Sequence, residues 1–585
     1  MKNILFILPV IFLVACSSIP RSSENEGAGE ISIGHMADIQ TQSDTYYHFM
    51  VGSLLEQEGE YDAALKQYTA AYRLDPNASE VALSIASLYL RKGQLGEAAF
   101  YAQKAVSSEP DNTRALLMMA GIYASKKQYD EAINAYRKVL TIDPKQEDAF
   151  IYLGTLYAGL KRYDEALATF KSLGKANPDS LMSPYYLGRL YTERHMFKEA
   201  LTEFKRAAFL RDDFEPAYSG IALVYELMNK IPQAIKAYKN AIALNPLNLE
   251  VRQHLAQLYI QQNELDNALE QLKRITSMDS RDLDAFVKMG LIYAEQKKFE
   301  EAAEAFKTVS SAVPNDVRVR RYLASTLVVL GRYEEALVEY RTILSGLPGD
   351  TDTLLQIAAL YSQMHRTVEA VSLLEKALAE QPGKPELYLY LGNAYMDLEK
   401  YQQAVDTLNK GLHMAPDRDD LMFSLAVVYE KMGKRDEMIV TLKKTIELKP
   451  DNADALNYLG YTYAEKGENL DESIRLIKRA LISKPGNGYI LDSLAWAYYQ
   501  KGMLKEALEK MAEAITKEGE DPVMREHYGD IFFKLSQKDQ AREQWLKSLE
   551  LDRKNQKLRE KFKAAGFGNP DELLKDIKPR GKGPK

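Results

Sequence analysis

Hydrophobic and small residues recur along this chain with a period of 34 residues. Within one period, two stretches with an apolar stripe at helical spacing are separated by a short turn, which predicts a pair of α-helices. The units run from Thr45 to Asn555, and an extra residue falls in a turn around Glu468-Asn469. Prolines mark the period at residues 76, 110, 144, 178, 246, 314, 348, 382, 416 and 450, and at 485 after a one-residue slip.

Three positions of the unit carry the same kind of residue nearly throughout. With the proline counted as position 32, position 8 is Gly or Ala in all fifteen units, and position 20 is Ala in thirteen. We therefore predict that these positions mark the closest approach of the two helices. Position 11 is Tyr in twelve units, which explains why the chain has 37 Tyr against 18 Phe. We interpret these tyrosines as core residues rather than as an aromatic binding site.

This pattern resembles the tetratricopeptide repeat, a helix–turn–helix unit. The resemblance extends over residues 45–555 and implies an all-α fold, a right-handed α-solenoid of about fifteen repeats. Residues 556–565 have the pattern of one more amphipathic helix, with Leu558 and Phe562 on its apolar side. We predict that this helix caps the C-terminal end of the solenoid, so that residues 556–585 comprise a capping helix and a basic tail.

The N-terminus has the pattern of a secretory signal. Lys2 precedes an apolar run from Ile4 to Val14, which is too short to span a bilayer as a helix. The run ends in Ala15-Cys16, and this end resembles the lipobox of bacterial lipoproteins. The resemblance implies that residues 1–15 are a signal peptide, and that Cys16 becomes the new N-terminus and carries the lipid.

The residues that follow the cysteine are predicted to form a tether. Residues 16–44 are rich in Ser, Gly, Glu and Gln and show no sustained apolar period, which favours a flexible segment. By the resemblance to lipoproteins, Ser17 and Ser18 imply delivery to the outer membrane. We therefore expect a lipid-anchored protein of the bacterial cell envelope that faces the periplasm.

Composition and motifs give no indication of an enzyme. The chain has 76 basic and 83 acidic residues, a net charge of −7, so nothing suggests binding to nucleic acid. Its single cysteine excludes an intrachain disulfide and any cysteine-based metal site. The seven histidines show no metal-binding spacing, and neither a phosphate-binding loop nor a nucleophile elbow occurs. We predict no catalytic residue, no metal and no cofactor.

The resemblance to tetratricopeptide repeats implies that the first helices of the units line a continuous groove. Positions 5, 9 and 12 of these helices carry apolar and aromatic residues, with acidic residues among them near the C-terminal end. An exposed aromatic cluster ringed by charge is typical of a protein-binding site. The alternative is that these side chains only pack against neighbouring helices. The predicted groove residues are Leu355, Leu389, Phe423, Tyr461, Asp492, Trp496, Tyr499, Glu526, Asp530 and Phe533.

The last units also resemble a particular group of proteins. Residues 455–481 and 489–515 are similar to the C-terminal repeats of outer-membrane lipoproteins that include the adaptor of a periplasmic C-terminal processing protease. The resemblance implies a scaffold that binds envelope proteins, such as a processing protease and its substrate. An alternative is a component of an exopolysaccharide export or pilus assembly machine, where such lipoproteins also occur.

Overall fold

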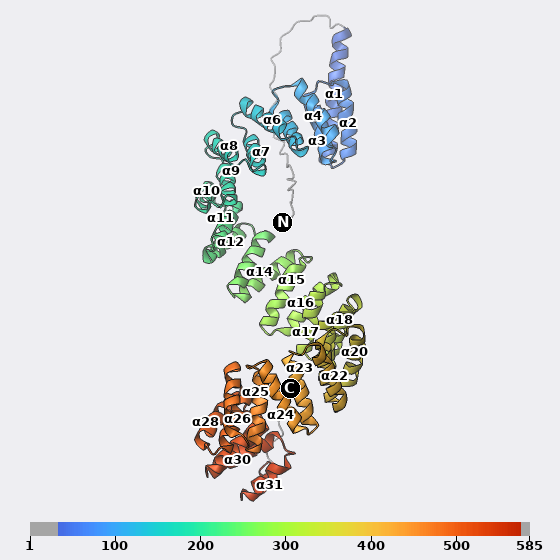
Figure 1. Cartoon of the computed structure of the whole chain (residues 1–585). Helices are drawn as coiled ribbons and strands as arrows, with labels where there is room; N and C mark the ends of the chain where they lie inside the picture. The colour runs from blue at the N-terminus through green and yellow to red at the C-terminus, as the bar shows by residue number, and fades with distance from the viewer. Residues whose placement is uncertain (1–32, 575–585) are drawn as a thin grey trace. The chain divides into compact units, whose positions relative to one another are not determined.

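The computed structural model describes residues 33–574 of the chain. Over these residues the chain forms 32 helices and no strand, so the all-α prediction is confirmed. Helices α1 to α12 and α15 to α30 pair in chain order, each odd-numbered helix with the next even-numbered one, and each pair is one unit of the repeat (Figure 1). We call the two members of a pair the first and the second helix. Two compact parts are present, Met1–Gln271 and Leu272–Lys585.

The helices of the first part are α1 (Ile33–Gln57), α2 (Tyr61–Leu74), α3 (Ser79–Arg91), α4 (Leu95–Ser108), α5 (Thr113–Ser125), α6 (Tyr129–Ile142), α7 (Glu147–Gly159), α8 (Tyr163–Ala176), α9 (Met182–Glu193), α10 (Phe197–Leu210), α11 (Glu215–Leu227), α12 (Ile231–Leu244) and α13 (Leu249–Gln261). Helix α14 (Leu265–Met278) contains the boundary between the two parts.

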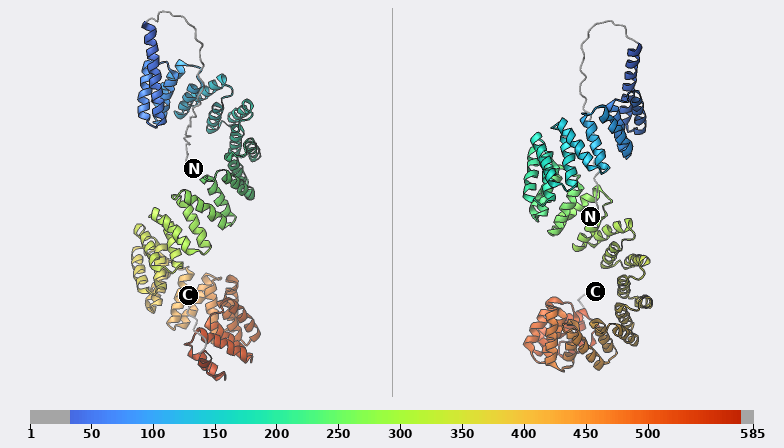
Figure 2. Two further views of the ribbon diagram at one scale, coloured as in Figure 1. Left: turned by 180° about the vertical axis from the view of Figure 1, so that it is seen from behind. Right: turned by 45° about the horizontal axis from the view of Figure 1, so that its top comes forward.

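The helices of the second part are α15 (Leu283–Glu295), α16 (Phe299–Ala312), α17 (Val317–Val329), α18 (Tyr333–Gly346), α19 (Thr351–Gln363), α20 (Thr367–Glu380), α21 (Pro385–Asp397), α22 (Tyr401–Met414), α23 (Asp419–Lys431), α24 (Arg435–Leu448), α25 (Ala453–Lys466), α26 (Leu470–Ser483), α27 (Gly488–Gln500), α28 (Leu504–Lys517), α29 (Pro522–Lys534), α30 (Lys538–Leu551), α31 (Gln556–Ala564) and α32 (Pro570–Leu573). Within each part, pair stacks on pair in sequence order, as the solenoid prediction requires (Figure 1, Figure 2).

A left-handed residue turns the chain from each first helix into the second. Gly93 has φ 71° and Gly331 has φ 72° at this position, while nine units place a residue other than glycine there, such as Lys127 with φ 61°. The next unit begins with a cap in many cases. Asn112 and Asn248, for example, each accept a hydrogen bond from the backbone N–H three residues later, at 3.1 Å. These local signals make each unit end and begin at the same positions.

The thirteenth unit absorbs the extra residue in its turn. Helix α25 has 14 residues where α23 and α27 have 13, and two left-handed residues follow it, Gly467 with φ 68° and Asn469 with φ 46°. The insertion therefore lengthens one helix end and one turn. The helices that follow keep the pattern of the repeat.

The small residue at position 8 contacts the side chain at position 24, on the second helix of the same unit. A Cβ atom on Gly290 would lie 2.5 Å from the ring of Phe306, and one on Gly188 would lie 2.8 Å from Phe204. All four units with Phe or Trp at position 24 have Gly at position 8. The sequence analysis paired position 8 with position 20; the structure shows that the large residue at position 24 explains the glycine.

The first helix starts earlier than the sequence pattern suggested. Helix α1 begins at Ile33, whereas the repeat was predicted to start at Thr45 after a flexible tether. Residues 33–44 therefore belong to the helix. They lack an apolar period because they extend beyond the hairpin: the side chains of residues 39–44 are exposed, so no packing partner selects apolar residues there. Adding residues to an existing helix costs far less than nucleating a new one.

The C-terminal end of the solenoid is capped as predicted. Helix α31 buries Leu558 and Phe562 completely, against a cluster that includes Trp545 and Leu549 of α30. The short helix α32, which the sequence analysis did not foresee, follows and buries Leu574 in the same cluster. The predicted signal peptide, Cys16 and the end of the basic tail lie outside the described residues. Among the helices of residues 33–574, none is long and apolar enough to cross a membrane.

Candidate protein-binding groove

The first helices of consecutive units lie against one another. Helix α25 contacts α27, α27 contacts α29, and the same holds for α19, α21 and α23, and for α7, α9 and α11. In a curved stack the inner row of helices is the more crowded one. The face formed by the first helices is therefore the inner face within each of these stretches, and positions 5, 9 and 12 lie on it.

A stack of three rings occupies this face near the C-terminal end. Trp496 on α27 lies on Tyr499, one turn further along the same helix, with ring centroids 4.8 Å apart and planes at 16°. Trp496 also stacks on His527 of α29, with ring centroids 4.0 Å apart and ring planes at 17° to each other. Trp496 and Tyr499 are half-buried, so their exposed edges remain available to a partner.

A buried carboxylate holds the histidine of this stack in place. His527 Nδ1 donates a hydrogen bond to Asp492 Oδ1 at 2.9 Å, and both residues are only 8% exposed. Burial acts to lower the pKa of His527, but Asp492, with Asp530 and Glu526 nearby, outweighs it and raises the pKa above the ordinary value. When the imidazole is protonated, it forms a buried ion pair with Asp492 between adjacent units.

A lysine of the capping helix pairs with the other two acids. Lys561 Nζ on α31 lies 2.8 Å from Glu526 Oε1 and 2.8 Å from Asp530 Oδ2, both on α29. The indole N–H of Trp545 donates a further hydrogen bond to Asp530 Oδ1 at 2.9 Å. Burial raises the pKa of Asp530, and the ammonium of Lys561 opposes that rise.

An apolar cleft lies beside this ion-pair network. Its volume is about 300 Å³, and Phe533 is the exposed aromatic residue at its edge, with 40% of its surface accessible. The ring of Phe533 lies 5.2 Å from that of Trp545, which fixes its orientation. The cleft is lined by Tyr499, Asp530, Phe533, Trp545, Lys561, Ala564 and Ala565.

The structure brings together most, but not all, of the predicted groove residues. Tyr461 is half-buried, and its pKa is raised to about 12, first by burial and then by the nearby acids, which include Asp492. Phe423 instead contacts Tyr458, with ring centroids 5.9 Å apart. Leu355 and Leu389 are half-buried on α19 and α21, in other units. The predicted residues that meet in one site are Asp492, Trp496, Tyr499, Glu526, Asp530 and Phe533.

The site differs from the predicted exposed cluster ringed by charge. Asp492 is buried beneath the stack, because it pairs with His527 across the helix interface. Sequence reasoning missed His527 and Lys561, which both supply a cation to this network. The available signal was the spacing: His527 lies 35 residues after Asp492, and Lys561 lies 35 residues after Glu526, about one repeat in each case.

Sequence comparisons identify the family. Family models of the tetratricopeptide repeat match residues 123–186, 227–286, 293–363 and 361–427, as well as 419–452 and 441–475. The tetratricopeptide repeat domain of cytochrome c-type biogenesis protein H matches residues 37–150. Together these matches cover more than half of the chain. The chain is a tetratricopeptide repeat protein.

Two solved structures also match this chain, both with low TM-scores. The Cut9–Hcn1 hetero-tetramer of APC/C has a TM-score of 0.37 and 16% identity, over 83% of this chain and 96% of that one. A tetratricopeptide repeat protein from Parabacteroides merdae has a TM-score of 0.28 and 19% identity, over 49% of this chain and 99% of that one. A comparison with curated proteins found no match.

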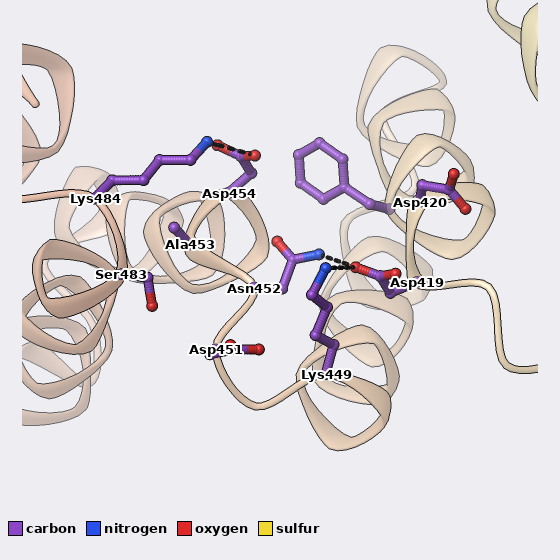
Figure 3. A pocket seen from close by; sticks show the side chains of 10 residues that line it. Asp419, Asp420, Lys449, Asp451, Asn452, Ala453, Asp454, Ser483 and Lys484 are labelled. Carbon is purple, nitrogen blue, oxygen red and sulfur yellow. Dashed lines mark hydrogen bonds and ion pairs between the residues drawn. The ribbon is translucent and has the colours of Figure 1, made fainter. Parts of the chain in front are cut away.

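A second cleft of the tetratricopeptide repeat array lies between units twelve and thirteen (Figure 3). It has a volume of about 350 Å³ and is lined mainly by polar residues. Its charges pair with one another: Lys484 Nζ lies 2.7 Å from Asp454, and the amide of Asn452 donates to Asp419 at 2.8 Å. The first pair lies within unit thirteen, and Asn452, the cap of α25, links that helix to α23, so we assign both pairs a structural role. Within residues 33–574, no group of three His, Cys, Asp or Glu side chains is placed to bind a metal ion.

Proposed function

We propose that this tetratricopeptide repeat protein is a membrane-anchored scaffold that binds partner proteins through the inner face of its array. The observation that carries the proposal is the C-terminal site: a stack of three rings and an apolar cleft on the first helices of the last units. Solenoids of this kind use such extended faces for binding. Tyr and Trp are also the residues most enriched at the centres of protein interfaces.

The ion pairs beneath the site support this proposal. His527 holds the ring of Trp496, and Trp545 holds that of Phe533, so both aromatic groups are oriented before a partner arrives. Preorganised side chains lose less conformational entropy on binding. Each acid of the site is already paired with His527 or Lys561, so an apolar partner surface does not have to bury an unpaired carboxylate.

The finer parts of the proposal come from the sequence. The lipobox at Cys16 supports anchoring in the cell envelope, and the resemblance of the last units to a protease adaptor supports a processing protease and its substrate as partners. The match of residues 37–150 to a biogenesis protein favours a role in assembling other proteins over a catalytic one. In the anchored form, partners would meet at a raised local concentration along one membrane.

The decisive experiment is affinity capture from envelope extracts with two variants of the full chain. Trp496→Ala/Phe533→Ala removes the aromatic site. Val338→Ala/Val440→Ala is the matched control, because both valines are exposed apolar residues on second helices. We expect a partner that the wild type and the control retain and the site variant loses. A partner retained equally by all three would contradict the proposal that the C-terminal site binds.

Anchoring is tested separately by cell fractionation. The wild-type chain is expected in the membrane fraction and Cys16→Ala in the soluble fraction. A Cys16→Ala chain that still fractionates with membranes would contradict lipid attachment, whereas the capture experiment would be unaffected by that result.

A further inference from the structure

The outer side of helix α1 carries an exposed apolar stripe. Ile39, Tyr46, Tyr47, Met50 and Leu54 are between 56% and 70% exposed, and they recur at spacings of three, four and seven residues. Such spacing places them on one face of the helix. Helix α1 has 25 residues against 14 in α2, and it extends past the end of its hairpin (Figure 2).

In the later units of each part, positions 3 and 10 of the first helix face the preceding hairpin, which covers them. Tyr47 occupies position 3 and is 64% exposed, whereas all fourteen later residues at position 3 are buried, none more than 4% exposed. Leu54 occupies position 10 and is 57% exposed, whereas Leu88, the next residue at that position, is fully buried. Val81 and Leu88 of α3 belong to one hydrophobic cluster with Tyr68 and Ala71 of α2.

The face of α1 therefore has the chemistry of a packing surface, but among residues 33–574 no helix packs on it as one does elsewhere in the array. The C-terminal end of the array is covered by helix α31. The apolar residues of α31, Leu558 and Phe562, are fully buried there. The exposure is thus a property of the N-terminal end and not of solenoid ends in this chain generally. An α-helix is the element that covers this side in each later unit.

The charge around the apolar face of α1 indicates which kind of helix would bind to it. Residues 33–65 contain six acidic residues and no Lys or Arg. Asp44 precedes Tyr47 by three residues and Glu58 follows Leu54 by four, so exposed carboxylates flank both ends of the stripe. A helix with Lys or Arg beside its apolar face would complement this surface.

We infer that α1 is a docking site for an amphipathic α-helix of a partner protein, one with a leucine-rich face bordered by basic residues. This site is separate from the inner face and goes beyond the proposed function. A second copy of the chain does not fit in either orientation. Two α1 helices would place their acidic residues together, and the capped C-terminal end has no apolar stripe to offer.

Two synthetic helices test the inference. Both have Leu at heptad positions a and d and Ala or Gln at b, c and f; one has Lys at e and g, and the other has Glu there. Fluorescence anisotropy with the full chain carrying Cys16→Ala should show binding of the Lys helix, and at least about tenfold weaker binding of the Glu helix. Equal binding of both helices would overturn the charge argument and the inference with it.

Variants of the chain locate the binding. Tyr47→Ser/Leu54→Ser removes apolar surface without changing charge, and should weaken binding of the Lys helix at least about tenfold. Val338→Ser/Val440→Ser, the matched control on second helices, should bind as the wild type does. A benzophenone amino acid at position 50 should crosslink to the helix, and one at position 338 should not. Unchanged affinity of the first variant, or no crosslink at position 50, would overturn the inference.

Two further outcomes would assign the face to another occupant and so overturn the inference. The first is self-association in sedimentation velocity that Tyr47→Ser/Leu54→Ser abolishes, which would show that a second copy binds there. The second is binding of the Lys helix that becomes at least about tenfold tighter when residues 17–32 are deleted, which would show that this segment of the chain covers the face. The inference requires a monomeric chain and an affinity that the deletion leaves unchanged.

Discussion

The indole ring of Trp496 lies flat on the imidazole of His527, with ring centroids 4.0 Å apart. The two residues belong to the first helices of consecutive units, α27 and α29. The contact therefore joins two repeats and at the same time orients the tryptophan of the proposed binding site. Because the imidazole is hydrogen-bonded to Asp492, the protonation of His527 is coupled to the geometry of the site.

The pKa of His527 should fall when Asp492 is replaced by Asn. Burial alone lowers the pKa of a histidine, and here the neighbouring carboxylates more than offset it. Asp492→Asn keeps a hydrogen-bond acceptor but removes the charge, while Glu526 and Asp530 remain paired with Lys561. We expect the pKa of His527 to lie above its ordinary value in the wild type and to fall in the variant, as followed by NMR of the imidazole protons.

The pair of His527 and Asp492 also determines the direction in which the stability of the protein changes with pH. Because the folded-state pKa of His527 is raised, its contribution to stability is fully present below the unfolded-state pKa of about 6.5, and is lost as the pH rises through the folded-state pKa. Asp492→Asn should remove this contribution. A stability loss in the variant that is larger at pH 8 than at pH 5.5 would contradict the ion pair.

Replacing Gly290 with Ala should destabilise the eighth unit. The new methyl group would lie 2.5 Å from the ring of Phe306, so the helices of the pair must separate or the ring must move. We expect a loss of about 1–3 kcal/mol in the opening free energy of α15 and α16, measured by hydrogen exchange. Gly346→Ala is the control, because no atom lies within 4 Å of its Cβ position.

The same pair offers a rescue. Three units, with Ala256, Ala358 and Ala426 at position 8, have Leu at position 24. Gly290→Ala/Phe306→Leu should therefore lose less stability than the sum of the two single changes. If the stability losses of the two single changes were additive, the ring of Phe306 would not be the reason for the glycine at position 8.

Removing the charge of Lys561 should loosen the C-terminal cap. Lys561→Met keeps the aliphatic stem but leaves Asp530, whose side chain is 11% exposed, without its cation. We expect the free energy of unfolding of the C-terminal units to fall by about 1–2 kcal/mol at pH 7. Lys563→Met, an exposed lysine on the same helix, should have little effect.

The loss of unfolding free energy caused by Lys561→Met should be smaller at acidic pH. Burial already raises the pKa of Asp530, and loss of the lysine should raise it further. The carboxyl group is then neutral at low pH, and its burial costs less there. The comparison of pH 4 with pH 7 by denaturant unfolding checks this, and an equal loss at both values would rule out Asp530 as the cause.

Two adjacent lysines test the turn between the helices. Lys127 has φ 61° and Lys126 has φ −82°, and both are exposed. Lys127→Gly should raise the stability of the third unit by about 0.5–1 kcal/mol, because glycine adopts the left-handed conformation without steric cost. Lys126→Gly should instead lower it by a similar amount. Thermal or denaturant unfolding of the two variants would show opposite signs, and equal signs would contradict the turn geometry.

Much of the fold was predictable because the repeat is local. Each unit repeats the small residue at position 8, the proline and the tyrosine, so the period alone identified paired helices and their boundaries. The start of α1 could not be found in this way. The side chains of residues 39–44 are exposed, and an exposed helical extension leaves no apolar pattern in the sequence.

The candidate site was predictable only in part. Trp496, Tyr499 and Phe533 stood out as aromatic residues at groove positions. Their cationic partners did not, because His527 and Lys561 act across the interface between units, about one repeat away from the acids they bind. Which side chains meet across that interface depends on how far each helix is displaced and rotated.

The sequence by itself determined the repeat, the number of units and the residues that each unit buries, because these follow from periodicity and from contacts within a hairpin. Only the tertiary structure decided which charges are neutralised and which apolar faces remain uncovered. Asp492 became a buried partner of His527, and Tyr47 was left exposed at a position that is buried in every later unit. The reason is physical: burial and pairing at these positions depend on the neighbouring unit, and among the described residues no helix precedes α1.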